Sequence, residues 1–276
     1  MNKILPIIQL SRPVNLIITF ISIFIGAFLT EVIEPIQNVL LACLSGVFIA
    51  AAANTINDYF DFEIDRVNKP HRPLPSKLIS PKTSFAMSIV EYGIGLILGL
   101  FISTEMFYFA LLFSILLFFY SAYLKRTVVW GNFAVSLSTA AAFVYGGLSV
   151  GNPSEAIIPA VFAFFYHFSR EILKDIQDIE GDRKDKAVTF PIRYGIQPAV
   201  LFIRSLFAIL LLLVLVPFLA GWYGLTYLLI VLFGVYPVII YVLMKAQEDT
   251  EPEELGFLSN LLKADMLIGL LAIYFR

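Results

Sequence analysis

The sequence predicts an all-α membrane protein, a single bundle of nine transmembrane helices with its N-terminus in the cytoplasm. The first supporting observation is composition, because 59% of the 276 residues are hydrophobic and only 14% are charged. The mean hydropathy of +0.85 lies well above that of a soluble domain. The second is a series of apolar runs, each near the length of about 20 residues that spans a bilayer. The third is that the basic residues gather on one side of the resulting topology.

The apolar runs extend along the sequence from near its start to its last residues, so we expect one transmembrane domain covering residues 1–276. The first run begins just after Arg12 and Pro13 and lacks a small-residue cleavage site. We therefore expect a permanent helix there and not a signal peptide. The runs occupy residues 14–33, 36–57, 83–103, 106–123, 129–150, 155–174, 198–219, 222–244 and 258–275.

Lysine and arginine set the orientation, because cytoplasmic loops carry the excess of positive charge. With the N-terminus inside, all of the 19 basic residues except the C-terminal Arg276 fall on the cytoplasmic side. We therefore predict a multi-pass protein of the cell membrane whose active site opens to the cytoplasm. Acidic residues deep within the spans are expected to be essentially absent, and no nucleic-acid partner is expected.

Two acidic segments follow spans of this topology and share one spacing. In the helical register of about 100° per residue, Asn54, Asp58, Asp61 and Asp65 of the first segment, "NTINDYFDFEID", fall within an arc of roughly 60°. The second segment, "REILKDIQDIEGD", repeats the spacing 117 residues later, as parallel internal repeats do. The matched residues are Asn54, Asp58, Asp61 and Asp65 in the repeat around residues 54–75, and Glu171, Asp175, Asp178 and Asp182 in the repeat around residues 171–193. We call the three aspartates of each segment the first motif and the second motif.

Six clustered aspartates require a positive partner, because two like charges about 4 Å apart cost on the order of 4 kcal/mol at an effective dielectric of 20. Only oxygen ligands are offered, and the single cysteine, Cys43, lies in an apolar run. Mg²⁺ prefers carboxylate oxygen and commonly shares it with substrate phosphates. The expected metal ligands are Asp58, Asp61, Asp65, Asp175, Asp178 and Asp182.

Basic residues surround both motifs and suit a diphosphate bound beside metal ions. The positive-inside rule explains any single one of them equally well. Asn54 is a further polar residue that either orients a ligand or satisfies backbone groups. The candidate diphosphate-binding residues are Asn54, Arg66, Arg72, Lys125, Arg126, Lys174, Lys184 and Lys186.

At these residues the chain resembles the UbiA superfamily of intramembrane prenyltransferases. The resemblance rests on "NDYFDFEID", "DIQDIEGD", the Arg12–Pro13 pair, "RPLPS" and "YSAYLKR", and it covers essentially the whole chain. It implies transfer of a prenyl group from a prenyl diphosphate to an acceptor, with Mg²⁺ holding the diphosphate between the two motifs. It also implies that Asp58, Asp61, Asp175 and Asp178 are catalytic.

Within the superfamily both segments look most like the archaeal digeranylgeranylglyceryl phosphate synthases. This implies geranylgeranyl diphosphate as donor and the free hydroxyl of geranylgeranylglyceryl phosphate as acceptor, forming the second ether bond of archaeal lipids. Candidates for binding that acceptor are Arg12, Asn15, Arg170 and Glu171. The chain departs from the expected pattern at Lys77, where we expect a glycine after "RPLPS".

Three alternatives remain open at the level of sequence. An aromatic-acceptor prenyltransferase of quinone or haem biosynthesis would use the same diphosphate site with a different acceptor pocket. A transporter would place ionisable residues deep in its spans. A CDP-alcohol phosphotransferase would have one aspartate-rich motif and fewer helices.

Overall fold

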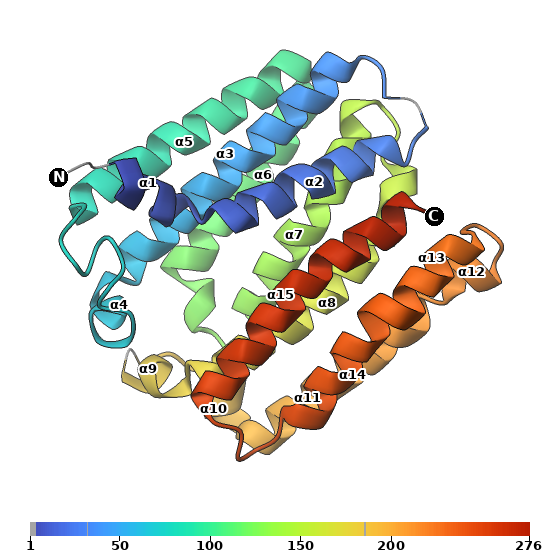
Figure 1. Cartoon of the computed structure of the whole chain (residues 1–276). Coiled ribbons are helices and arrows are strands. Elements are labelled where there is room, and N and C mark those ends of the chain that lie inside the picture. Colours follow the sequence, from blue (N-terminus) through green and yellow to red (C-terminus); the bar gives the residue numbers. More distant parts are fainter. Residues whose placement is uncertain (1–3, 32, 185) are drawn as a thin grey trace. The chain divides into compact units, whose positions relative to one another are not determined.

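A computed structural model describes residues 4–31, 33–184 and 186–276 of the chain. Helices are the only regular secondary structure in these residues, as expected for the predicted all-α class. Contacts within the chain form two compact units (Figure 1).

Unit 1 comprises Met1–Lys125 and Ala141–Ile157, and unit 2 comprises Arg126–Ala140 and Ile158–Arg276. One continuous helix, α7 (Trp130–Ser149), contributes to both units.

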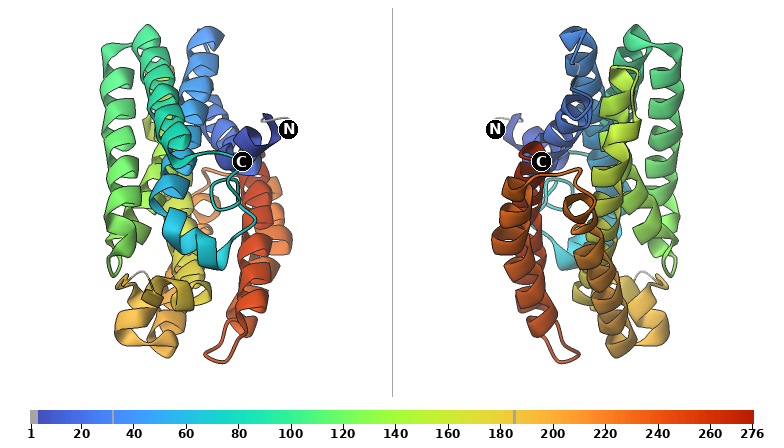
Figure 2. Two further views of the ribbon diagram at one scale, coloured as in Figure 1. Left: turned by 90° about the vertical axis from the view of Figure 1, so that its left-hand side faces the viewer. Right: turned by 90° about the vertical axis from the view of Figure 1, so that its right-hand side faces the viewer.

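Unit 1 is built around α3, which packs against α2, α5 and α6. Figure 2 shows α5 and α6, coloured teal and green, running side by side as a hairpin. Serine side chains cap both helices at their N-termini, because Ser80 Oγ accepts from the Thr83 amide and Ser103 Oγ from the Met106 amide. The helices of this unit are α1 (Ile4–Ser11), α2 (Pro13–Phe28), α3 (Ile36–Phe60), α4 (Phe62–Asn68), α5 (Pro81–Ile102), α6 (Thr104–Ala122) and the 3₁₀ turn η2 (Ser154–Ala156), with η1 (Leu124–Arg126) at its boundary.

Unit 2 places α15 against α13, α14 and the π-helical segment η3, and α14 and α15 form a hairpin (Figure 2). The π-helical segment lies just before Pro237, which has no amide to bond to the carbonyl four residues earlier. The helices are α8 (Ile157–Gln177), α9 (Ile179–Lys184), α10 (Phe190–Tyr194), α11 (Ile196–Leu213), α12 (Val216–Leu219), α13 (Leu225–Ile230), η3 (Val231–Val235), α14 (Tyr236–Lys245) and α15 (Pro252–Tyr274).

The predicted multi-pass character is confirmed in its coarser form. Within the described residues, seven helical segments are long and apolar enough to cross a membrane, and the pair α1 and α2, bent by 49°, would be an eighth. Helix α7 has 20 residues but is rich in glycine, serine and alanine, and it is not among these segments.

Helix α2 and the C-terminal half of α7 touch backbone to backbone within unit 1. A Cβ atom on Gly26 would lie 2.0 Å from the carbonyl oxygen of Phe143, and one on Gly146 would lie 1.9 Å from that of Ile23. Both distances are impossible for a real side chain, so these two positions require glycine. Small residues allow this close approach where helices associate in a membrane.

We expect Gly146→Ala to destabilise the folded protein by about 1–3 kcal/mol, because its methyl group must push α2 away from α7. The measurement is thermal unfolding in detergent. Gly93→Ala is the matched control, because a Cβ on Gly93 in α5 meets nothing within 4 Å. That control should hold or slightly raise the melting temperature, since alanine favours the helix. Equal melting temperatures for the two variants would contradict the close contact.

Candidate functional site

The first motif lies where α3 ends. Asp58 occupies the last turn of α3, Asp61 sits at the break between α3 and α4, and Asp65 lies in α4. The three residues are only 5%, 3% and 3% exposed, respectively. The break at Asp61 means that the predicted single helical face is in fact carried by two helices.

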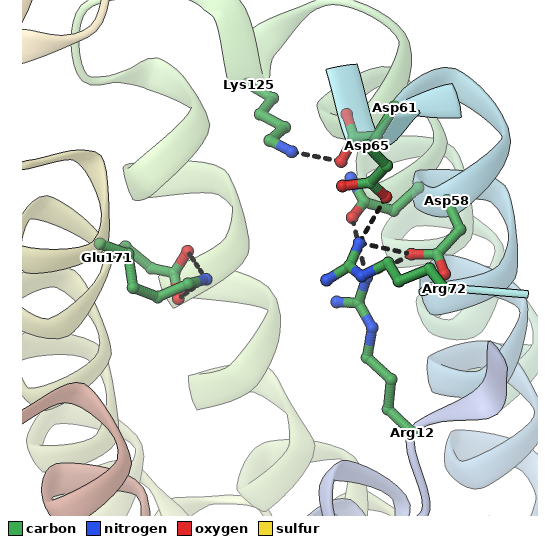
Figure 3. A network of polar contacts seen from close by, with 9 residues as sticks. Arg12, Asp58, Asp61, Asp65, Arg72, Lys125 and Glu171 are labelled. Atoms are coloured by element: carbon green, nitrogen blue, oxygen red, sulfur yellow. Dashed lines mark hydrogen bonds and ion pairs between the residues drawn. The ribbon is translucent and has the colours of Figure 1, made fainter. Parts of the chain in front are cut away.

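Three cations neutralise the three carboxylates (Figure 3). Arg72 Nη1 lies 2.6 Å from Asp65 Oδ2 and 3.3 Å from Asp58 Oδ1. Arg12 forms an ion pair with Asp58, and Lys125 forms one with Asp61. We call these six residues, Arg12, Asp58, Asp61, Asp65, Arg72 and Lys125, the first-motif cluster.

Arg12 reaches the cluster from the break between α1 and α2. Its φ of 54° and ψ of 73° place it in the left-handed region, and the following Pro13 disfavours the right-handed helical conformation at this residue. Asn54 Nδ2 donates to the Ser11 carbonyl over 2.9 Å and so ties α3 to this break. Arg12 Nη2 also donates to Asn57 Oδ1 over 3.3 Å.

Arg72 is held by a compact turn of backbone. The amides of Leu78 and Ile79 both donate to the Pro73 carbonyl, over 3.0 and 3.1 Å. Lys77, where the sequence pattern leads us to expect glycine, has a φ of 62°. Glycine adopts this left-handed conformation at no steric cost, so the expected residue and the observed backbone agree.

Burial raises the pKa of Asp65 above its ordinary value, and Arg72 opposes that effect by Coulombic attraction and a hydrogen bond. The neighbouring carboxylates of Asp61 and Asp58 raise the same pKa further. Asp65 therefore depends on cationic partners to remain charged.

The second motif has the same local construction within unit 2. Asp175 lies near the end of α8, Asp178 lies between α8 and α9, and Asp182 lies in α9. Asn132 Nδ2, from α7, donates to Asp175 Oδ2 over 2.8 Å. The two segments therefore repeat in structure as well as in sequence, because each breaks its helix at the second aspartate.

Helix α8 also carries a partly buried group of charges one turn before Asp175. Glu171, 8% exposed, accepts from Lys174 Nζ through both carboxylate oxygens at 2.9 Å (Figure 3). Arg170 Nη1 lies 3.5 Å from Glu171 Oε1, and Arg170 Nε donates to the Ser259 carbonyl of α15 over 3.0 Å. Two cations and one carboxylate give this group a positive excess.

Several predicted site residues have other positions or partners. Arg66 pairs with Glu63 at 3.1 Å, and both side chains are exposed. The Arg126 carbonyl accepts from the Val188 amide over 3.0 Å. Lys184 and Lys186 are exposed, and Asn15 is half-buried.

Within the described residues, no three histidine, cysteine or acidic side chains are arranged to hold one metal ion together. In the first motif, Arg12, Arg72 and Lys125 take up carboxylate oxygens that a metal ion would use. The donor chemistry nevertheless suits Mg²⁺, because buried carboxylate oxygens predominate.

Sequence reasoning missed Asn132 and the role of Asn57 beside Arg12. Both are amides in or beside apolar runs, which is a signal that a search limited to charged residues overlooks. The expectation that deep acidic residues are absent is wrong at two positions, because Glu91 lies in the middle of α5 and Asp265 within α15. Asp265 is 1% exposed and its Oδ2 accepts from the Tyr166 hydroxyl over 2.8 Å.

Comparison with known proteins gives consistent results. The sequence profile of the UbiA prenyltransferase family matches residues 19–261. A digeranylgeranylglyceryl phosphate synthase of Methanosphaera stadtmanae is 34% identical over 264 residues, which cover 96% of each chain.

Solved structures agree in fold. A structure described as giving insight into digeranylgeranylglyceryl phosphate synthase in membranes superposes with a TM-score of 0.77 and 31% identity, covering 99% of this chain and 98% of that one. A UbiA homologue from Archaeoglobus fulgidus, bound to DMAPP and Mg²⁺, has a TM-score of 0.72 at 23% identity and covers 98% of this chain and 99% of its own. The family match, the similarity along nearly the whole length and the repeated aspartate segments together show that the chain belongs to the UbiA prenyltransferase family.

Proposed function

We propose that this protein transfers a geranylgeranyl group from geranylgeranyl diphosphate to the free hydroxyl of geranylgeranylglyceryl phosphate. An ether bond forms between the acceptor oxygen and the first prenyl carbon, the bond from that carbon to the diphosphate breaks, and the hydroxyl proton is released. The observation that supports this most is the first-motif cluster, in which three buried carboxylates and three cations converge. The likeness to a digeranylgeranylglyceryl phosphate synthase along 96% of the chain supports the choice of substrates.

Both motifs are proposed to supply metal ligands. Asp58, Asp61 and Asp65 of the first motif and Asp175, Asp178 and Asp182 of the second would hold Mg²⁺, which supplies Lewis-acid stabilisation of the leaving diphosphate when bound. Arg72 and Lys125 would donate hydrogen bonds to the diphosphate oxygens, where negative charge develops as the carbon to oxygen bond breaks. Arg12, which the sequence suggested for the acceptor, is instead proposed to join them at the diphosphate, because it forms an ion pair with Asp58.

The acceptor phosphate is assigned to the charged group on α8. Arg170 is oriented through its Nε bond to the Ser259 carbonyl and its Nη1 contact with Glu171, and it would contribute positive charge to the acceptor phosphate. Lys174 adds a second cation, and Glu171 holds it in place. An acceptor without any anionic group would have no use for this positive excess.

The nine predicted spans are proposed to be the seven apolar segments, the bent pair of α1 and α2, and α7. At 1.5 Å per residue, the 20 residues of α7 extend about 30 Å, enough to cross the hydrocarbon core. The distribution of lysine and arginine supports a cytoplasmic N-terminus and a site that opens to the cytoplasm.

The test is a turnover assay on detergent-purified protein with geranylgeranyl diphosphate, Mg²⁺ and one of three acceptors. Geranylgeranylglyceryl phosphate should give product, whereas 4-hydroxybenzoate should give none. Geranylgeranylglycerol, the matched acceptor without phosphate, should lose at least about 100-fold in kcat/KM, because the cations of α8 would lack their partner. Product from the aromatic acid alone would instead favour an aromatic-acceptor enzyme.

A further inference from the structure

The ion pairs of the first-motif cluster and a bound metal ion would draw on the same three carboxylates. Arg72 holds Asp65 Oδ2, Lys125 holds Asp61 Oδ2, and Arg12 and Arg72 both contact Asp58 Oδ1. Mg²⁺ requires its oxygen ligands at about 2.0–2.1 Å in a nearly ideal octahedron. Like charges at close range repel, so the guanidinium and ammonium groups have to move away when a metal ion binds the same carboxylates.

The charges of the cluster favour joint binding over binding of either ligand alone. Three carboxylates and three cations leave the side chains of the cluster with no net charge. A metal ion alone must displace a cation that then has no anion to contact. A diphosphate alone must draw the cations away from carboxylates that are buried, which is costly for an unpaired charge.

The exposure of the side chains indicates which partners are free to exchange. The side chains of Asp58, Asp61 and Asp65 are 4–5% exposed, while those of Arg12, Arg72 and Lys125 are 29%, 23% and 31% exposed. The carboxylates are short and fixed by α3 and α4, whereas the cations are long and reach the cluster from its outer side. The cations can therefore rotate toward a new anion while the carboxylates stay in place.

We infer that Arg12, Arg72 and Lys125 are internal counter-ions that make divalent metal and prenyl diphosphate bind cooperatively to the first motif. On joint binding, the metal takes the carboxylate oxygens and the diphosphate takes the three cations. This inference rests on the proposed function, because it assumes that the first motif holds a metal and diphosphate. It assigns Arg12 a role in regulating that site, since the residue links the break between α1 and α2 to Asp58.

The test measures Mn²⁺ uptake by electron paramagnetic resonance, with Mn²⁺ as the probe for the metal. Purified protein is titrated with Mn²⁺ alone and again with the thiolo analogue of geranylgeranyl diphosphate, whose bridging sulfur prevents transfer. Solution chelation is subtracted with a titration that contains the analogue without protein. The wild type should bind Mn²⁺ at least about tenfold more tightly with the analogue than without it.

The decisive variant is Arg12→Gln, which removes one counter-ion and leaves every carboxylate. Its affinity for Mn²⁺ alone should rise about tenfold, and the effect of the analogue should shrink by the same factor, since coupling is reciprocal. Lys82→Gln removes an exposed charge from the start of α5 and should behave as the wild type does. Arg12→Lys keeps the charge and should restore most of the coupling that Arg12→Gln loses. If thermal unfolding shows that Arg12→Gln does not fold, Lys125→Gln takes its place. That variant removes the counter-ion of Asp61, and its affinity for Mn²⁺ alone should likewise rise.

Two results would overturn the inference. The first leaves the proposed function standing, and the second rejects the proposed function as well. Equal affinity of the wild type and Arg12→Gln for Mn²⁺ alone would reject the counter-ion role and leave the proposed metal site standing. No uptake of Mn²⁺ by the wild type, with or without the analogue, would reject the metal site and with it the proposed function.

Discussion

Asp61→Asn should lose at least about a thousandfold in turnover with geranylgeranyl diphosphate and geranylgeranylglyceryl phosphate. The neutral amide keeps the shape of the side chain but removes the charge of a proposed metal ligand, and metal stabilisation of a leaving group is worth several kcal/mol. The measurement is kcat in saturating Mg²⁺. Thermal unfolding, measured alongside, should show a folded protein.

The control for Asp61→Asn is Glu63→Gln, two residues further along the chain. The Glu63 side chain is 73% exposed and pairs with Arg66 outside the first-motif cluster. Its loss should change turnover by less than about threefold, because exposed ion pairs contribute little. If Asp61→Asn retained wild-type activity in Mg²⁺, the first motif would not be the metal site.

Asp178→Asn is expected to have an equally large effect, at least about a thousandfold in kcat, because Asp178 occupies the position in the second motif that Asp61 occupies in the first. Glu180→Gln is the matched control, since Glu180 is exposed in the adjoining helix α9. That control should leave turnover unchanged.

The double variant Asp61→Asn with Asp178→Asn shows whether the two motifs act on one reaction. Catalytic groups that act as a unit are strongly non-additive, so the double variant should be about as inactive as either single variant. A loss equal to the product of the two single losses would mean that the motifs act independently.

Sequence alone predicted the aspartates and their spacing because these features are local. A helix places residues at plus four and plus three on one face, and this holds whatever the helix packs against. Both segments break their helix at the second aspartate. The spacing of the aspartates could not reveal this break, because the same spacing is compatible with one continuous helix.

The partners of the aspartates were harder to predict because they depend on packing. Arg12 reaches Asp58 across 46 residues of sequence, and that contact depends on how α2 lies on α3. Arg72, seven residues after Asp65, was easier to assign to the site, because a short loop limits how far it can go. Asn132 and Asp175 meet only through the packing of α7 and α8.

Composition was sufficient to predict the apolar spans but not to find charged residues within them. Long apolar runs predicted the most hydropathic of the candidate spans, Ile196–Leu219 and Leu225–Lys245. Glu91 was passed over because 21 largely apolar residues surround it in α5. An average over a window hides a single charged residue.

The left-handed backbone at Lys77 determines how this loop can vary among related sequences. Since the Lys77 side chain is exposed, natural variation at this position will be selected by φ and not by charge. Glycine and asparagine adopt the left-handed backbone at a low energetic cost, while valine and isoleucine are excluded because their branched Cβ clashes with it. Lysine at this position therefore carries a conformational strain of about 1 kcal/mol that glycine would not.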